Sequence, residues 1–287
     1  MNTGLCISIS GGGALGIGPA WYLKRLEEDL GRPLPQKIIG QAGTSTGSII
    51  AACLAEGFTA SKIFDLYEKN LQKIFTGYPW YKKYLPKVPK YDNSNLKDIL
   101  RKNLSGKCTS WNNTFIPTTF MNSKNVEKVW DSKDDVEKAL AVLTSCSAPT
   151  YFDVIVDKDK NSFCDGGLWA NSCPDILMAG MFNAGERNIR ILNLETGMEA
   201  PNTTDPGNKT LIQWAGYIMD DWVARSSKSR AYICKSVLGE ENLFTVIPKV
   251  AKEYKMDNLS VTAEIIAIWE EEYKRTRKDL LRFVNPY

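Results

Sequence analysis

Two features of the 287-residue sequence predict an α/β fold with three layers, in which helices flank a mainly parallel central sheet. Short apolar runs that contain β-branched residues alternate with longer segments whose apolar residues recur at helical spacing. Such alternation of strands and helices is typical of a parallel sheet that is covered on both faces. Because the sequence contains neither an internal repeat nor a low-complexity linker, we expect one domain over residues 1–287.

The first part of the chain is predicted to contain two strand–turn–helix units. Residues 5–9 are apolar and lead directly into glycines, which indicates a buried strand that ends in a loop. A helix is expected over residues 14–30, because acidic residues stand near its end and Gly31 follows it. A second strand is then expected at residues 37–42, followed by helices at residues 46–56 and 59–75.

The middle of the chain is predicted to contain a hairpin. Residues 154–156 and 162–164 flank the charged turn 157–161, which is typical of two antiparallel strands. The apolar pattern also predicts a strand at residues 115–121 and helices at residues 94–104 and 134–145.

The last part of the chain is predicted to be mainly helical. Pro174 suits the first turn of a helix over residues 174–182, and residues 189–194 have the composition of a buried strand. Residues 208–287 are expected to form a helical C-terminal extension. Its elements are a mainly helical stretch at 210–237, a strand at 244–247 and a long helix at 260–283.

The composition is that of an ordinary globular protein and excludes two functions. Hydrophobic residues make up 43% of the chain and charged residues 24%. The formal net charge of +3 is too small to indicate nucleic acid, so no nucleic-acid partner is expected. The sequence contains no histidine, which excludes zinc sites of the mixed cysteine–histidine kind.

The cysteines and the N-terminal residues indicate the compartment. The seven cysteines are an odd number without Cys-x-x-Cys spacing, which favours reduced, packed thiols in the cytosol. The first residues, MNTGLCISIS, lack the basic region and cleavage site of a signal peptide. No apolar run approaches the roughly 20 residues that span a bilayer. We therefore expect a cytoplasmic protein, whose contact with membranes is confined to their surface.

A glycine-rich turn follows the first expected strand. The residues Gly11-Gly12-Gly13-Ala14-Leu15-Gly16 match the G-x-G-x-x-G pattern of dinucleotide sites, but the acidic residue that this pattern requires about 20 residues later is missing. The glycines could also form a tight strand-to-helix turn and no more. The functional alternative is an oxyanion hole, in which backbone N–H groups bind the negative charge that develops in acyl transfer.

Ser45 lies in the sequence Gly43-Thr44-Ser45-Thr46-Gly47, between an expected strand and a helix of small residues. This context is that of a nucleophile elbow, where Gly43 and Gly47 remove side chains that would collide at a strained turn. The alternative is a serine that only caps the helix, a role that the neighbouring hydroxyl residues could fill equally well.

A serine nucleophile needs a base, and this chain has no imidazole. A carboxylate is the leading substitute. Asp165 ends an apolar run and precedes Gly166 and Gly167, so its side chain would be held in a turn that leaves the carboxylate accessible. The alternative is an Asx-turn without a chemical role, and the residues around Asp165 do not decide between the two.

The order of these motifs resembles that of the patatin-like phospholipase family. The resemblance covers about residues 5–200, with a weaker likeness at Leu238-Gly239 and Met256-Asp257. Its blocks are Gly11-Gly12-Gly13 with Gly16, the GTSTG turn, Ser147-Ala148-Pro149-Thr150-Tyr151-Phe152, Asp165-Gly166-Gly167-Leu168-Trp169-Ala170-Asn171 and Ile191-Leu192-Asn193-Leu194-Glu195-Thr196-Gly197.

The resemblance implies a lipid acyl hydrolase of the phospholipase A or lysophospholipase type. It assigns Ser45 as nucleophile, Asp165 as its base, and the amides of the glycine run 11–13 as the oxyanion hole, with no metal and no cofactor. A lipid- or nucleotide-sensing module with little hydrolysis and an acyltransferase are the alternatives, and a small-molecule or protein activator is compatible with each. Two departures stand out: Leu15 replaces the family's usual Arg or Lys, and the sequence 171–174 replaces the usual Asn-Asn-Pro.

Residues 78–91, YPWYKKYLPKVPKY, mix aromatic rings, lysines and three prolines. Aromatic rings suit the headgroup boundary of a membrane, and lysines attract anionic lipid. We expect a loop that contacts the membrane, although an ordinary surface loop with packed rings is an equal alternative. The candidate contacts are Trp80, Lys82, Lys83 and Lys87.

Overall fold

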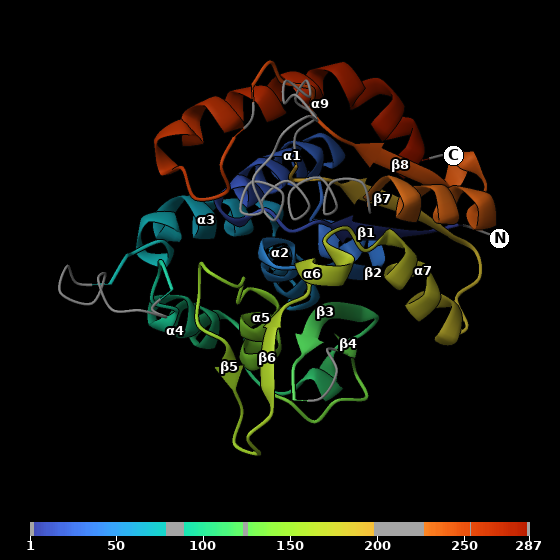
Figure 1. Ribbon diagram of the computed structural model, residues 1–287. Helices are drawn as coiled ribbons and strands as arrows, with labels where there is room; N and C mark the ends of the chain where they lie inside the picture. Colours follow the sequence, from blue (N-terminus) through green and yellow to red (C-terminus); the bar gives the residue numbers. More distant parts are fainter. Residues whose placement is uncertain (1–2, 79–88, 123–125, 198–226, 253, 286–287) are drawn as a thin grey trace, which may run out of the picture.

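The computed structural model describes residues 3–78, 89–122, 126–197, 227–252 and 254–285, and it confirms the α/β architecture (Figure 1). Across these ranges, eight strands form one sheet in the order β5-β6-β3-β2-β1-β7-β8, with β4 paired to β3. The strands are β1 (Gly4–Ile9), β2 (Ile38–Gly43), β3 (Thr114–Phe120), β4 (Val126–Trp130), β5 (Ile155–Val156), β6 (Ser162–Asp165), β7 (Ile189–Leu194) and β8 (Leu243–Val246).

The sheet is mainly parallel, as predicted, but it has an antiparallel edge. The pairs β1–β2, β1–β7, β2–β3 and β7–β8 are parallel. The pairs β3–β4, β3–β6 and β5–β6 are antiparallel, and β5 with β6 forms the predicted hairpin. Strands β1 and β2, which precede the glycine-rich turn and Ser45, therefore lie in the middle of the sheet. Strand β6, which ends at Asp165, belongs to its antiparallel edge.

Helices cover both faces of the sheet. They are α1 (Ile17–Leu30), α2 (Thr46–Ala55), α3 (Ala60–Ile74), α4 (Ser94–Asn103), α5 (Lys138–Ser145), α6 (Gly167–Ala170), α7 (Pro174–Asn183), a helix at residues 227–238 and α9 (Thr262–Val284).

Strand β1 demonstrates why this arrangement has three layers. Its residues Leu5, Ile7 and Ile9 belong to a core that includes side chains of α1, α2, α3 and α9. The alternating residue Cys6 belongs to a second core, which includes side chains of α7 and Cys234 of the helix at 227–238. Since successive residues of a strand point to opposite faces, the central strand is buried on both sides.

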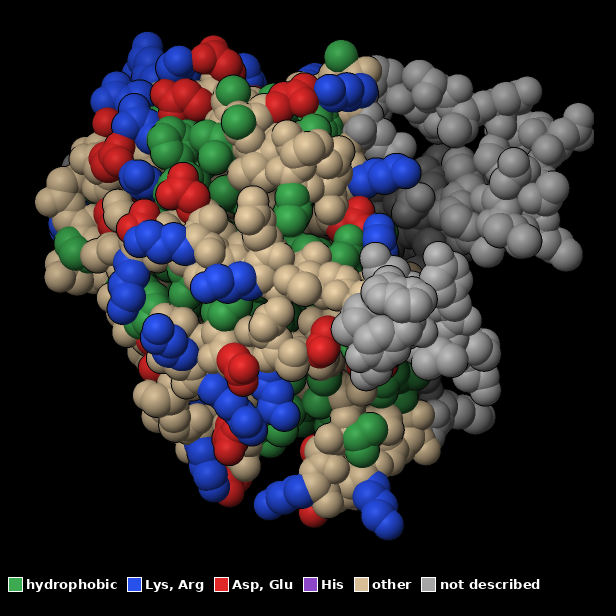
Figure 2. All heavy atoms as spheres, turned by 90° about the vertical axis from the view of Figure 1, so that its left-hand side faces the viewer, with side chains coloured by type: hydrophobic (Ala, Val, Ile, Leu, Met, Phe, Trp, Pro, Cys, Tyr) green, Lys and Arg blue, Asp and Glu red, His purple; other side chains and the backbone are tan. Residues whose placement is uncertain are grey.

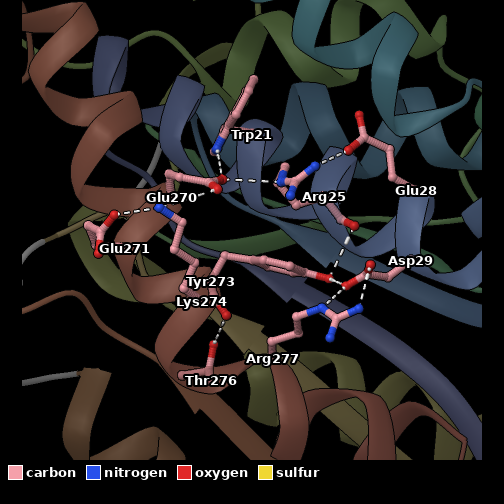
Figure 3. A network of polar contacts seen from close by, with 10 residues as sticks. All are labelled: Trp21, Arg25, Glu28, Asp29, Glu270, Glu271, Tyr273, Lys274, Thr276 and Arg277. Atoms are coloured by element: carbon pink, nitrogen blue, oxygen red, sulfur yellow. Dashed lines mark hydrogen bonds and ion pairs between the residues drawn. The ribbon is translucent and has the colours of Figure 1, made fainter.

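Helix α9 is fixed across α1 by a network of polar contacts (Figure 3). The Glu270 carboxylate accepts hydrogen bonds from Trp21 Nε1 and Arg25 Nε, each at 3.1 Å. One turn further along, Tyr273 and Arg277 both donate to the Asp29 carboxylate. The network therefore anchors the helix that begins directly after the glycine-rich turn.

The structure corrects several predicted boundaries. The helix expected at 14–30 begins at Ile17, because residues 13–16 form a 3₁₀ turn. The helix expected at 134–145 begins at Lys138, because the Asp134 carboxylate closes a turn by accepting the Asp131 amide at 3.0 Å. Strand β4 and the short helix α6 were not predicted. Of the stretch expected to be helical at 210–237, residues 227–237 are helical and the rest lies outside the described residues.

Two further findings concern contact with membranes and with charged partners. Within the described ranges, no helix combines the length and apolar character needed to cross a membrane. On the face that carries α3 and α4, the described Lys and Arg side chains are interspersed with Asp and Glu (Figure 2).

Candidate active site

Ser45 occupies a strained turn between β2 and α2. Its backbone angles are φ 53° and ψ −126°, in a region that non-glycine residues rarely adopt. The side chain is half-buried and makes no capping hydrogen bond to α2, so the capping interpretation of this serine does not describe its conformation. Strain of this kind is typical of a nucleophile that is held on a sharp strand-to-helix turn.

The two glycines that flank Ser45 are required by close backbone contacts. A Cβ atom at Gly43 would overlap the carbonyl oxygen of Gly47. A Cβ atom at Gly47 would in turn overlap the carbonyl oxygen of Ile9, the last residue of β1. The turn can therefore approach β1 this closely only because both positions lack a side chain.

The backbone of Ser45 is held by two residues at the end of α5. The Ser45 amide donates to Ser145 Oγ at 3.0 Å, and the thiol of Cys146 donates to the Ser45 carbonyl at 3.0 Å. The Ser48 hydroxyl donates to the same carbonyl at 2.6 Å. We did not predict a role for Ser145 from the sequence, where the only signal was its place in the short polar run Thr144-Ser145-Cys146-Ser147.

Asp165 is brought next to Ser45 by the pairing of the strands. Both β2 and β6 pair with β3, β2 with its first residues and β6 with its last ones. Asp165 is the final residue of β6, and its amide donates to the Ser147 carbonyl at 3.0 Å. The Ser45 side chain lies close enough to the Asp165 carboxyl group to lower its pKa.

Asp165 is 4% exposed, and this burial makes the pKa of its carboxyl group unusual. Burial raises its pKa from 3.8 to about 7, while the nearby Ser45 side chain and the hydrogen bond from the Gly167 amide oppose that shift. The Gly167 amide donates to Asp165 Oδ1 at 2.7 Å, so the carboxylate also closes the turn that the sequence suggested as an alternative. Turn formation and contact with Ser45 occur together in this residue.

The glycine-rich turn passes beside Ser45. A Cβ atom at Gly11 would lie 3.0 Å from Ser45 Cβ. The Gly11 amide donates to the Asn171 carbonyl at 2.9 Å, and the Ala14 amide donates to the Met256 carbonyl at 2.7 Å. In the described part of the chain, no acceptor is recorded for the amides of Gly12 and Gly13. Of the three predicted oxyanion donors, Gly11 is thus already engaged, which leaves Gly12 and Gly13.

The remaining predicted positions fall into three groups. Gly166 packs against β3, where a Cβ atom would overlap the Pro117 carbonyl oxygen. Leu15 is 6% exposed and belongs to the hydrophobic core. The candidate membrane contacts Trp80, Lys82, Lys83 and Lys87 lie outside the described residues. Among the residues that the structure describes, no group of three or more Cys, Asp or Glu side chains is arranged to hold a metal ion.

A protein-family model described as patatin-like phospholipase matches residues 7–178. A cGAMP-activated phospholipase of Pseudomonas aeruginosa is 25% identical over 274 residues, which cover 88% of this chain and 80% of that protein. A cUMP-AMP-activated phospholipase of Escherichia coli is 30% identical over 216 residues, which cover 69% of this chain and 66% of that protein.

Plant and structural relatives agree with this match. Patatin-like protein 2 of Arabidopsis thaliana is 33% identical over 216 residues, covering 61% of this chain and 51% of the plant protein. Among solved structures, VipD from Legionella pneumophila superimposes with a TM-score of 0.54 at 14% identity, covering 96% of this chain and 66% of VipD. At that identity the likeness to VipD concerns the fold alone.

Proposed function

Because this chain belongs to the patatin-like phospholipase family, we propose that it cleaves fatty-acyl esters of membrane phospholipids through an acyl-serine intermediate on Ser45. One observation carries this proposal. In a chain without histidine, the side chain of a strained serine lies beside the buried carboxyl group of Asp165 and lowers its pKa. A carboxylate that takes the serine proton replaces the imidazole of the usual triad.

In the first half of the proposed reaction, Ser45 Oγ attacks the ester carbonyl carbon while Asp165 accepts the hydroxyl proton. The amides of Gly12 and Gly13 bind the resulting oxyanion. The bond to the alcohol oxygen then breaks, the alcohol takes the proton from Asp165, and the acyl group remains on Ser45. In the second half, Asp165 accepts a proton from water, whose oxygen attacks the acyl carbonyl. The fatty acid leaves, and the proton returns to Ser45.

The raised pKa of Asp165 supports its role as base. An ordinary aspartate with a pKa near 3.9 is a weak proton acceptor at neutral pH. Burial raises the pKa of Asp165 to about 7, which suits proton transfer at that pH. The strained backbone of Ser45 and the contacts of its amide keep the nucleophile in place, so that positioning contributes alongside proton affinity.

Substitution of the two side chains tests the mechanism. We expect purified Ser45→Ala and Asp165→Asn proteins to keep their circular dichroism spectra and to lose ester hydrolysis by at least about 1,000-fold. The substrates are mixed phospholipid vesicles, and the products are identified by mass spectrometry. Substantial hydrolysis by folded Ser45→Ala protein would contradict the assignment of the nucleophile.

The same product analysis separates hydrolysis from its alternatives. Free fatty acid with lysolipid supports hydrolysis, and a new ester supports transfer to another acceptor. Two relatives are named as phospholipases activated by cGAMP or by cUMP-AMP, so each nucleotide is added in parallel reactions. Turnover only in the presence of a nucleotide supports an activator-dependent enzyme. Nucleotide binding without turnover supports a sensing module.

We also propose that the enzyme acts at the cytoplasmic surface of a membrane, which it contacts through residues 78–91. The composition of this segment supports the proposal, since its lysines and aromatic rings match the chemistry of a lipid headgroup layer. The flanking residues are anchored to the body of the protein. Tyr78 donates to the Asp153 carboxylate at 2.6 Å, and Tyr91 donates to the Asp257 carboxylate at 2.8 Å.

A further inference from the structure

Glu195 is a buried carboxylic acid that the proposed mechanism does not use. It directly follows β7 and is 4% exposed. Its carboxylate accepts hydrogen bonds from the Ser172 hydroxyl and, at 2.8 Å, from Asn193 Nδ2. The nearby Ser10 and Ser227 side chains also favour its charged form. Burial raises the pKa of Glu195 above its usual value, although these hydrogen bonds oppose the shift.

The partners of Glu195 are the sequence neighbours of the candidate active site. Ser10 immediately precedes Gly11, and Ser172 immediately follows Asn171, whose carbonyl accepts the Gly11 amide at 2.9 Å. The Glu195 carboxylate thus accepts from Ser172, which follows the segment that begins at Asp165, and lies near Ser10, which precedes the glycine-rich turn.

The residue after Glu195 makes a second connection to the same turn. The Thr196 amide donates to Ser10 Oγ at 2.8 Å, and the Thr196 hydroxyl donates to the Gly11 carbonyl. A Cβ atom at Gly12 would overlap Thr196 Oγ1, so the two segments are in direct contact. The end of β7 therefore lies behind the glycine-rich turn and limits how it can move.

We infer that Glu195 is a positioning residue, whose carboxyl group fixes the amides of Gly12 and Gly13 relative to Ser45 and Asp165. The inference rests on the proposed function, in which those amides bind the oxyanion. A buried carboxylate with several hydrogen-bond donors holds them strongly, and its removal leaves those donors unsatisfied. A misplacement of the oxyanion donors by about 1 Å is enough to cost roughly 100-fold in rate.

Three variants and a soluble p-nitrophenyl ester test this inference. Glu195→Leu removes every acceptor at this position, whereas Glu195→Gln keeps the shape and one acceptor oxygen. We expect Glu195→Leu to lower kcat at least about tenfold with KM within about twofold of the original, and Glu195→Gln to restore most of that loss. Ser172→Ala, which deletes a single donor and is milder for folding, should lower kcat about threefold.

The control is Glu56→Gln, a substitution of the same type at a distance from the site. Glu56 follows the end of α2 and forms an ion pair with the buried Lys138. We expect this variant to lower the melting temperature without changing kcat. If Glu195→Leu and Ser172→Ala retain the original kcat, or if both raise KM instead, the inference is overturned.

Hydrogen exchange provides a measurement that does not depend on turnover. In Glu195→Leu, or in Ser172→Ala if the leucine variant fails to fold, peptides that cover residues 10–17 and 164–176 should both exchange faster than in the original protein. In Glu56→Gln, neither should change. Faster exchange limited to residues 189–197 would overturn the inference. If the original protein hydrolyses no ester but the variant still exchanges faster in both loops, the positioning role of Glu195 is supported and the proposed function is not.

Discussion

The buried hydroxyl of Ser145 accepts the Ser45 amide at 3.0 Å and donates to the Pro117 carbonyl at 2.6 Å. Through this one side chain, the end of α5 connects the strained turn of Ser45 to β3. The same Pro117 carbonyl contacts Gly166, which follows Asp165. Ser145 therefore joins the two segments that carry the proposed nucleophile and its base.

We predict that Ser145→Ala lowers kcat for a soluble ester about tenfold, because the Ser45 backbone loses the acceptor that holds it. Ser147→Ala is the matched control. Its hydroxyl is also buried but donates only to the Leu143 carbonyl one turn earlier, at 2.8 Å. Steady-state kinetics of the two variants check the prediction, and equal effects on kcat would contradict it.

The activity should depend on pH through Asp165. Since burial raises the pKa of this carboxyl group to about 7, and since a base must be deprotonated to act, kcat/KM should rise about tenfold per pH unit below 7 and level off above it. A profile of kcat/KM from pH 5 to 9 on a soluble ester measures this. A flat profile between pH 5 and 8 would count against Asp165 as the base.

Loss of the same Asp165 proton should raise the activity but lower the stability of the folded protein as the pH increases. The folded-state pKa of Asp165 is about 7 and the unfolded value is 3.8, so between these values the folded protein holds a proton that the unfolded chain releases. The contribution of Asp165 to stability is therefore present below about pH 4 and lost as the pH rises through about 7, by up to about 4 kcal/mol.

The variant Asp165→Asn tests that sign, because an amide cannot ionise. Relative to the original protein, this variant should be more stable at pH 8 than at pH 5, that is, its free energy of unfolding should be relatively larger at pH 8. Urea unfolding at the two pH values measures the difference. If the relative stability is the same at both, Asp165 does not have a raised pKa in the folded state.

Restoring the family's usual cation at position 15 should destabilise the protein. Leu15 is 6% exposed in the hydrophobic core, so Leu15→Arg would bury a charge without a partner, at a cost of about 3 kcal/mol or more. Leu15→Met, which conserves volume, should cost less than about 1.5 kcal/mol. Urea unfolding of both variants checks this, and equal stability would mean that the arginine side chain reaches solvent.

The lysines of residues 78–91 should increase binding to anionic vesicles. Each lysine near an anionic surface contributes about 1 kcal/mol, so replacing Lys82, Lys83 and Lys87 by Gln should weaken binding about 100-fold at low salt. Lys90 is left in place because it pairs with Asp257. Neutralising three exposed lysines elsewhere, Lys158, Lys160 and Lys278, is the control, and co-sedimentation with vesicles is the measurement. Equal binding by the two triple variants would refute a specific membrane contact.

The local parts of the fold and site could be predicted from the sequence. The turn around Ser45 was predictable because a strand, two glycines and a helix of small residues are adjacent in the chain, and the structure has the same order. The strand β4 was not, since its side chains are mostly exposed or half-buried and its pairing partner β3 supplies the hydrogen bonds. Strands of this kind lack the apolar pattern on which prediction depends.

The contacts between distant segments could not be predicted from the residues themselves. Asp165 meets Ser45 because β2 and β6 both pair with β3, and no local pattern encodes that pairing. The resemblance to a family suggested the pair of residues, but not Ser145, which stands in a run of similar polar residues. The engagement of the Gly11 amide by Asn171 likewise depends on a turn that lies 160 residues further along the chain.

The lack of histidine has a practical consequence for the study of this protein. Burial raises the pKa of all seven thiols above the neutral range, and Asp165 is the described carboxyl group whose pKa is about 7. Burial also raises the pKa of Glu195, so without histidine, near-neutral proton uptake or release by the described side chains is expected to involve these buried carboxyl groups. A covalent serine inhibitor that modifies the Ser45 hydroxyl should change the proton balance measurably in unbuffered solution, without a background from histidine.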